Sequence, residues 1–325
     1  MKRIYRYITQ FALALGLLGS LSACRKVVVD TPEEGRYEIA FDQVETKALI
    51  TDGNLGNFKV WGEINSGTAD VFEGVVVTKG YDINANTIWT YPAADTQYWE
   101  ENTTYNFFAV APTDIELEYD GKWGVPYEMP EQILTSADEL QDVVVARASR
   151  TTTTITEQPA PVELGFEHIL TKINLNLQKS TENNDQTIRV TDVYVLGMQG
   201  KGTYQFDSGW SYAHEAKYVA IEDADIELQD GVKHSIGAFL AIPQALSAEG
   251  VQQVYLLVDF IYSDESSSTS RYHVVPLPVD SVPEWQSGKE ITYTAVISVD
   301  QSIRFETPNV ASWGTSQSGG TIIIK

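Results

Sequence analysis

Apolar residues recur at every second position in short runs along most of the chain, and Gly, Asn, Asp and Pro separate the runs. This period of two is typical of strands with one face on a core. In KINLNLQ (Lys172–Gln178), for example, Ile173, Leu175 and Leu177 share one face of the predicted strand. The other clear runs are Tyr37–Val44, Phe58–Ile64, Thr87–Pro92, Thr104–Pro112, Ile188–Met198, Ser235–Pro243, Val251–Asp264, Arg271–Val279 and Ile291–Val299.

Helical periodicity is confined to Ala137–Val143 and Glu167–Lys172, where we expect at most a turn or two of helix. The 17 Tyr, 11 Phe and 7 Trp also favour strands, because aromatic side chains suit a pleated, half-buried surface. The pattern therefore predicts an all-β protein built from sandwiches.

The Thr-rich stretch RTTTTITEQPAP (Arg150–Pro161) separates two strand-rich halves of similar size. Its two prolines, Pro159 and Pro161, resist pairing in a β-ladder and favour a linker. A chain of this length tends to divide its core between domains. We therefore predict two β-sandwich domains in tandem, over residues 24–160 and 161–325.

The N-terminal residues have the plan of a signal peptide, which we place at residues 1–23. Lys2, Arg3 and Arg6 precede the apolar run Phe11–Leu21, which is shorter than the about 20 residues that a membrane span needs. The run ends in Leu-Ser-Ala-Cys, which resembles a bacterial lipobox. The resemblance implies cleavage between Ala23 and Cys24, acylation of Cys24, and attachment to the outer membrane at the cell surface.

The formal net charge is −23 and the sequence pI is near 4.4. So acidic a surface repels phosphate backbones and anionic headgroups, so that nucleic acid is not an expected partner. Membrane contact should come from the lipid. Cys24 is the one cysteine of the sequence, which excludes internal disulfides.

The residues that most often carry chemistry form no convincing motif here. The four histidines, His168, His214, His234 and His273, lack metal-like spacing, and DINANT (82–87) departs from a calcium loop at the positions that need Gly and Glu. A hairpin turn explains DINANT better. The glycine clusters open no helix, and no nucleophile elbow is present. We expect no enzyme, no metal and no cofactor.

The order of these features resembles the fimbrillin family, in particular its Mfa-like branch of lipoprotein-derived pilus subunits. The resemblance rests on the lipobox, YEIAFDQV followed by TKA (Thr46–Ala48), FKVWGEI, WTYP, TYNFFAVAP, VELGFEHILTKINLNL (Val162–Leu177), and the final ASWG and GGTIIIK. It implies two transthyretin-like β-sandwiches and a structural or adhesive role in a cell-surface fimbria (pilus). The implied partners are other fimbrial subunits and a host or bacterial surface ligand.

The family resemblance also implies assembly by donor-strand exchange. A protease cuts after the first strand, which leaves with the lipid, and a neighbouring subunit donates a strand in its place. The first strand would present Tyr37, Ile39 and Phe41 on one face, and the equivalent bond is Lys47–Ala48. The family usually has Arg at this position, so that cleavage by an Arg-specific enzyme is in question; Arg36 is an alternative that would leave the strand attached.

Two points stay open at the level of sequence. The donor candidate is Thr321–Lys325, with Thr321, Ile322, Ile323 and Ile324, joined by Ile303–Glu306; both could equally be ordinary final strands. The alternative function is a surface glycan-binding lipoprotein that stacks sugars on exposed tryptophans, for which the candidates are Trp61, Trp89, Trp99, Trp123, Trp210 and Trp285.

Overall fold

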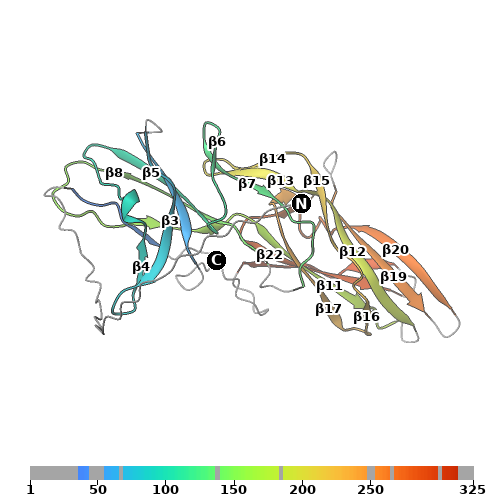
Figure 1. The fold of residues 1–325 in the computed structure, drawn as a ribbon. Helices are drawn as coiled ribbons and strands as arrows, with labels where there is room; N and C mark the ends of the chain where they lie inside the picture. The colour runs from blue at the N-terminus through green and yellow to red at the C-terminus, as the bar shows by residue number, and fades with distance from the viewer. Residues whose placement is uncertain are drawn as a thin grey trace, which may run out of the picture. The chain divides into compact units, whose positions relative to one another are not determined.

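The computed structural model describes residues 36–43, 55–65, 69–135, 140–182, 186–246, 253–263, 267–298 and 302–313. Among these residues, every regular element is a strand except the 3-10 turn η1 (Ala93–Asp95). The strands form several sheets in a sandwich-like arrangement (Figure 1), which confirms the all-β prediction. Within the described ranges, no helix has the length and apolar character that crossing a bilayer requires.

The first half of the chain supplies most of a six-stranded antiparallel sheet. Its order is β10 (Glu167–His168), β8 (Val144–Thr151), β5 (Thr104–Ala111), β2 (Phe58–Ile64), β3 (Ala69–Tyr81) and β4 (Thr87–Thr90). A parallel pair, β1 (Phe41–Gln43) and β9 (Val162–Leu164), packs with the sheet over a first core. The buried residues of this first core are Ile39, Phe41, Leu55, Phe58, Val60, Phe72, Val77, Trp89, Trp99, Tyr105, Phe107, Ala109, Ala111, Val144, Ala146, Val162, Leu164 and Phe166.

Two further sheets enclose a second core. One has the order β17 (Lys233–Ala241), β11 (Thr171–Lys179), β22 (Lys289–Ile297) and β23 (Ile303–Phe305), with β24 (Asn309–Ser312) also on β22. The other has the order β15 (Ala216–Ile221), β12 (Thr187–Gln199), β19 (Tyr255–Ser263) and β20 (Ser268–Pro276), with β16 (Ile226–Leu228) on β12. The short strands β18 (Gln244–Ala245) and β21 (Glu284–Trp285) pair with each other.

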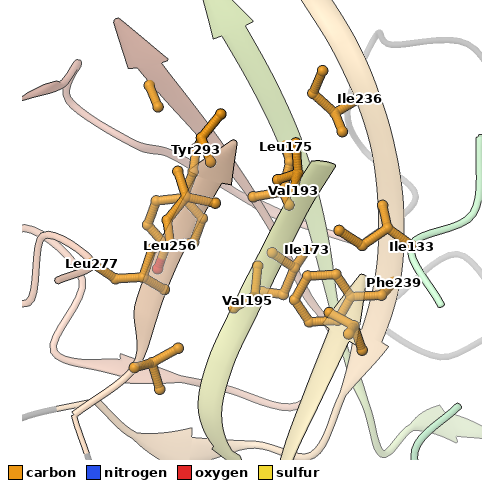
Figure 2. Packing of buried hydrophobic residues seen from close by; sticks show 14 of the residues in the cluster. Ile133, Ile173, Leu175, Val193, Val195, Ile236, Phe239, Leu256, Leu277 and Tyr293 are labelled. Carbon is orange, nitrogen blue, oxygen red and sulfur yellow. The ribbon is translucent and has the colours of Figure 1, made fainter. Parts of the chain in front are cut away.

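The second core shows the alternation that the sequence predicts. Ile173, Leu175 and Leu177 of β11 are buried at every second position. Figure 2 shows Ile173 and Leu175 beside Val193 and Val195 of β12, with side chains from other strands around them. The side chains of two sheets interdigitate here, as a sandwich requires.

A fourth sheet joins strands from before and after the predicted linker. Its order is β14 (Gly209–Tyr212), β13 (Lys201–Gln205), β7 (Trp123–Glu128) and β6 (Glu118–Tyr119), and β7 pairs with β13 in antiparallel register. Residues from both halves also share a third cluster, which includes Phe108, Leu170 and Trp313. The predicted boundary at residue 160 stays a prediction, and these contacts cross it.

The expectation of helix at Glu167–Lys172 is wrong. Glu167 and His168 form β10, which pairs with Val145 and Val144 of β8, and Thr171 begins β11. Pairing with distant strands overrides a weak local pattern, because six residues are too few for a helix to be stable by itself.

Candidate functional site: the first strand

Residues 36–43, which we call the first segment, lie between two stretches that are distant in sequence. On one side, the Ile39 N–H donates to the Gln97 carbonyl oxygen at 2.9 Å, and the Trp99 N–H donates to the Tyr37 oxygen at 2.9 Å. On the other side, the Val162 N–H donates to the Ala40 oxygen at 2.7 Å, and β1 continues in parallel register with β9. The first segment therefore lies as a strand between Gln97–Trp99 and Val162–Leu164 and hydrogen-bonds to both.

Side chains from the surrounding chain also bind the backbone and rings of the first segment. The Tyr91 hydroxyl donates to the Ile39 carbonyl oxygen at 2.6 Å, and Gln158 Nε2 donates to the Glu38 oxygen at 2.8 Å. Burial raises the pKa of Tyr91 to about 12, so that its phenol stays a neutral donor at physiological pH. A side chain of the first segment also donates to the surrounding chain: the Tyr37 hydroxyl donates to the Thr156 carbonyl oxygen at 3.0 Å.

Two side chains of the first segment lie in the first core. Ile39 is 1% exposed and Phe41 is 4% exposed, while Tyr37 is partly buried against the same core. The Phe41 ring makes edge-to-face contacts with Phe72 and Phe107, at centroid distances of 5.3 and 5.6 Å. Burying each of Ile39 and Phe41 contributes about 1.5–3 kcal/mol, so this short strand closes the first core.

The position of the first segment determines what its removal would expose. A segment of this kind is joined to the fold by a few backbone bonds and two buried side chains. Its loss would leave unpaired backbone groups at Gln97, Trp99 and Val162, and would expose the aromatic rings that Phe41 covers. Such an edge suits any strand that offers apolar side chains at alternate positions.

Several predicted site residues lie outside the described ranges. They are Ala23 and Cys24 at the predicted lipidation site, Lys47 and Ala48 at the predicted processing bond, and Thr321, Ile322, Ile323 and Ile324 of the donor candidate. The second part of the donor candidate is described. Ile303–Phe305 forms β23, which pairs with β22 of its own chain, so that this part is an ordinary strand here.

The sequence alone does not identify the residues that receive the first segment. Gln97–Trp99 follow η1 and show no alternation, and Val162–Leu164 lie at the start of the predicted second half. The one available signal was the apolar pair Val162 and Leu164, which has the period of a buried strand.

Four of the six tryptophans are too deeply buried to form the platforms that the glycan-binding alternative needs. Trp61, Trp89, Trp99 and Trp285 are all buried, with at most 8% of their surface exposed. Trp123 and Trp210 are half-buried and pack against the third cluster. The four buried side chains offer no open face on which a sugar ring would stack.

Among the described residues, no group of three or more His, Cys, Asp or Glu side chains is placed to hold a metal ion. The DINANT stretch is a hairpin turn in which Asp82 Oδ1 accepts the N–H groups of Asn84 and Asn86, at 2.7 and 2.9 Å. One histidine has an unforeseen environment. His168 contacts the buried carboxylate of Asp142, and its ring stacks on Trp313 at a centroid distance of 4.5 Å.

The fold and this site define a class of all-β protein in which a short early strand, interposed between distant parts of the chain, closes an aromatic core. A family of this class matches the sequence directly. The chain belongs to the fimbrillin-like family, whose model matches residues 46–313. The family consists of structural and adhesive proteins and not of enzymes, which confirms the expectation of no catalysis.

One solved structure shows a similar fold, and a second matches this chain less closely. A fimbrial protein from Bacteroides vulgatus is 17% identical, with a TM-score of 0.59 over 86% of this chain and 99% of that chain. The fimbrial anchor protein Mfa2 from Porphyromonas gingivalis is 10% identical, with a TM-score of 0.41 over 86% of this chain and 98% of that chain. No protein with a curated description matches the chain.

Proposed function

We propose that the chain is a structural or adhesive subunit of a cell-surface fimbria, and that its partners are other fimbrial subunits. Membership of the fimbrillin-like family supports this role. The proposal includes export as an outer-membrane lipoprotein attached through Cys24. It also includes assembly by strand donation once the first segment has been removed. The single observation that carries strand donation is the position of the first segment, between Gln97–Trp99 and Val162–Leu164.

Cleavage at Lys47–Ala48 would convert the first segment from part of the chain into a bound peptide. The bond lies between β1 and Leu55, so that after the cut the segment is held by noncovalent contacts alone. Those contacts are the few backbone bonds and the two buried side chains described above. A strand of similar pattern at high local concentration can then replace it.

The donor that we propose is the C-terminal Thr321–Ile324 of a neighbouring subunit. In an extended strand, Ile322 and Ile324 point to the same side, because side chains alternate between faces. The same spacing separates Ile39 and Phe41 in the first segment. The donated pair could therefore fill the positions that Ile39 and Phe41 occupy in the unprocessed subunit.

The proposal is tested by treating the purified full chain with a lysine-specific protease. We expect a cut after Lys47, an N-terminus at Ala48 by mass spectrometry, and oligomers that increase with protein concentration in size-exclusion chromatography. Lys47→Gln should prevent both the cut and the oligomers. Lys122→Gln, at an exposed position between β6 and β7, is the matched control and should behave as the parent chain.

Two results would count against the proposal. A chain that is cut cleanly after Lys47 and stays monomeric would exclude strand donation by this route. Oligomers that form equally well from the Lys47→Gln chain would show that removal of the first segment is not required. An acylated Cys24 at the N-terminus of the protein isolated from membranes would support the lipoprotein part independently.

A further inference from the structure

The sheet β15-β12-β19-β20 has one face on the second core and an outer face of unusual composition. Its inward side chains, such as Val193 and Val258, are buried. The outward positions between them are also largely apolar or aromatic, and Tyr218, Tyr272 and Val274 among them are 43%, 70% and 46% exposed. Other apolar or aromatic members of this outer face include Tyr194, Leu196, Tyr255, Leu257 and Ile261.

The strand register arranges these residues in rows. Tyr194 on β12 lies opposite Leu257 on β19, which in turn lies opposite Val274 on β20. In the next row Asp192 lies opposite Asp259, which lies opposite Tyr272. An ordinary solvent-facing sheet surface carries mixed charges at such positions. Here an aromatic and aliphatic surface surrounds a pair of carboxylates.

The two carboxylates repel each other. Like charges directly opposite on neighbouring strands destabilise a sheet. Partial burial and the charge of Asp192 both raise the pKa of Asp259. Within the described residues, no hydrogen bond or ion pair is made by the Asp259 side chain, and Asp192 accepts a hydrogen bond from the Asp223 N–H at 3.2 Å.

A third carboxylate lies beside this row. The Tyr194 hydroxyl donates to Glu222 Oε1 at 3.0 Å, and this hydrogen bond is the main reason that the pKa of Tyr194 is raised to about 12. The rows that contain Asp192, Tyr194 and their partners include no lysine or arginine. Arg189, opposite Ile261 on the same face, is paired with Asp225 and Glu227, so that a positive charge for Asp192 and Asp259 would come from another molecule.

We propose that this outer face binds a positively charged segment of a partner protein, with lysine or arginine next to aromatic or aliphatic residues. The basic side chain would lie between Asp192 and Asp259, and would contact the face of Tyr272. Its apolar neighbours would cover Leu257 and Val274. This surface is separate from the first segment, so that the proposal does not depend on strand donation.

Charge complementarity opposes a contact between two copies of this chain through this outer face. The chain carries a formal net charge of −23, and two outer faces in contact would bring four aspartates together. A juxtaposition of this kind opposes binding, whereas a basic segment relieves the repulsion that already exists within the face.

The test is fluorescence anisotropy of a labelled peptide of alternating lysine and tyrosine, titrated with the purified full chain. A peptide in which glutamine replaces every lysine is the neutral counterpart. We expect the lysine peptide to bind and the neutral peptide to bind at least about tenfold more weakly. The double variant Asp192→Asn/Asp259→Asn should weaken binding of the lysine peptide about tenfold, and Tyr272→Ser about threefold.

Matched controls remove the same groups from the other half of the chain. Asp70→Asn/Glu73→Gln removes two exposed carboxylates from β3, and Tyr81→Ser removes a tyrosine that is 65% exposed. Each control should change the affinity less than about twofold. An equal loss in the control double variant would overturn the proposal, because attraction to total charge would then explain the binding. So would tight binding of a neutral oligosaccharide that requires Tyr272 and does not require the aspartates.

A second measurement separates binding from a structural role. Without a partner, Asp192→Asn/Asp259→Asn should raise the Tm of the chain, because the repulsion between the carboxylates is removed and asparagine can still accept the Asp223 N–H. A lower Tm would show that the carboxylates support the fold, and the proposal would fail.

Discussion

At the scale of single residues, Asp142 is a buried acid whose side chain needs hydrogen-bond partners within the protein. Its side chain is 0% exposed and accepts the Val143 N–H at 2.7 Å, and its other partner is the ring nitrogen of His168. Burial raises the pKa of Asp142 because desolvation disfavours the charged form. His168 in turn stacks on Trp313, which belongs to the third cluster that both halves share. The contact between Asp142 and His168 therefore holds a ring that packs on this cluster.

Removing the histidine should therefore cost more than neutralising the acid. His168→Ala leaves the buried Asp142 side chain without its ring-nitrogen partner, and we expect a loss of about 3–5 kcal/mol in the free energy of unfolding. Asp142→Asn removes the buried charge and keeps an acceptor for the Val143 N–H, so that its loss should be smaller. Urea unfolding of the two variants measures the difference, and a larger loss in Asp142→Asn would contradict this account.

The same pair predicts a direction with pH. An acid whose pKa is raised on folding contributes stability while it is protonated, and this contribution is lost as pH rises from its unfolded value through its folded value. For Asp142 that window begins near the ordinary value of 3.8 and extends upward. The stability of the parent chain relative to Asp142→Asn should accordingly fall as pH rises across this window, and a difference that stays constant would argue against a raised pKa of Asp142.

At the scale of elements, the first segment is short, but replacing its buried side chains by smaller ones should destabilise the fold. Phe41→Ala removes a ring that contacts Phe72, Phe107 and Tyr91, and we expect a loss of about 3–5 kcal/mol in the free energy of unfolding. Glu38→Ala, at an exposed position of the same segment, should change it by less than about 0.5 kcal/mol. Equal effects in urea unfolding would mean that Phe41 does not close the first core.

At the scale of the whole molecule, the sequence predicts which face of a strand is buried better than it predicts which strands pair with each other. Alternation at Ile173, Leu175 and Leu177 identifies the buried face of β11 correctly, because local period and burial agree. The pairing of β1 with β9 joins Phe41 to Val162, and no local pattern encodes a contact of such separation. For the same reason no local pattern predicts the contacts of His168 with Asp142 and Trp313, which are distant from it in sequence.

The net charge of −23 gives the two proposed interactions opposite responses to salt. Contacts between copies bring like charges together, so that screening by salt should favour them, and strand donation itself rests on backbone bonds and apolar burial. The contact with a basic partner depends on attraction and should weaken under the same conditions.

We therefore expect oligomers of the chain cut at Lys47 to form at least about threefold faster at high than at low ionic strength. Over the same range, the lysine peptide should lose affinity for the outer face of β15-β12-β19-β20. Light scattering follows the first quantity and fluorescence anisotropy the second, on one preparation. If oligomer formation slows with salt, attraction between unlike charges joins the copies, and the strand-donation model fails in the form proposed here. If salt leaves the peptide affinity unchanged, apolar contact alone holds the peptide, and the role of Asp192 and Asp259 is refuted.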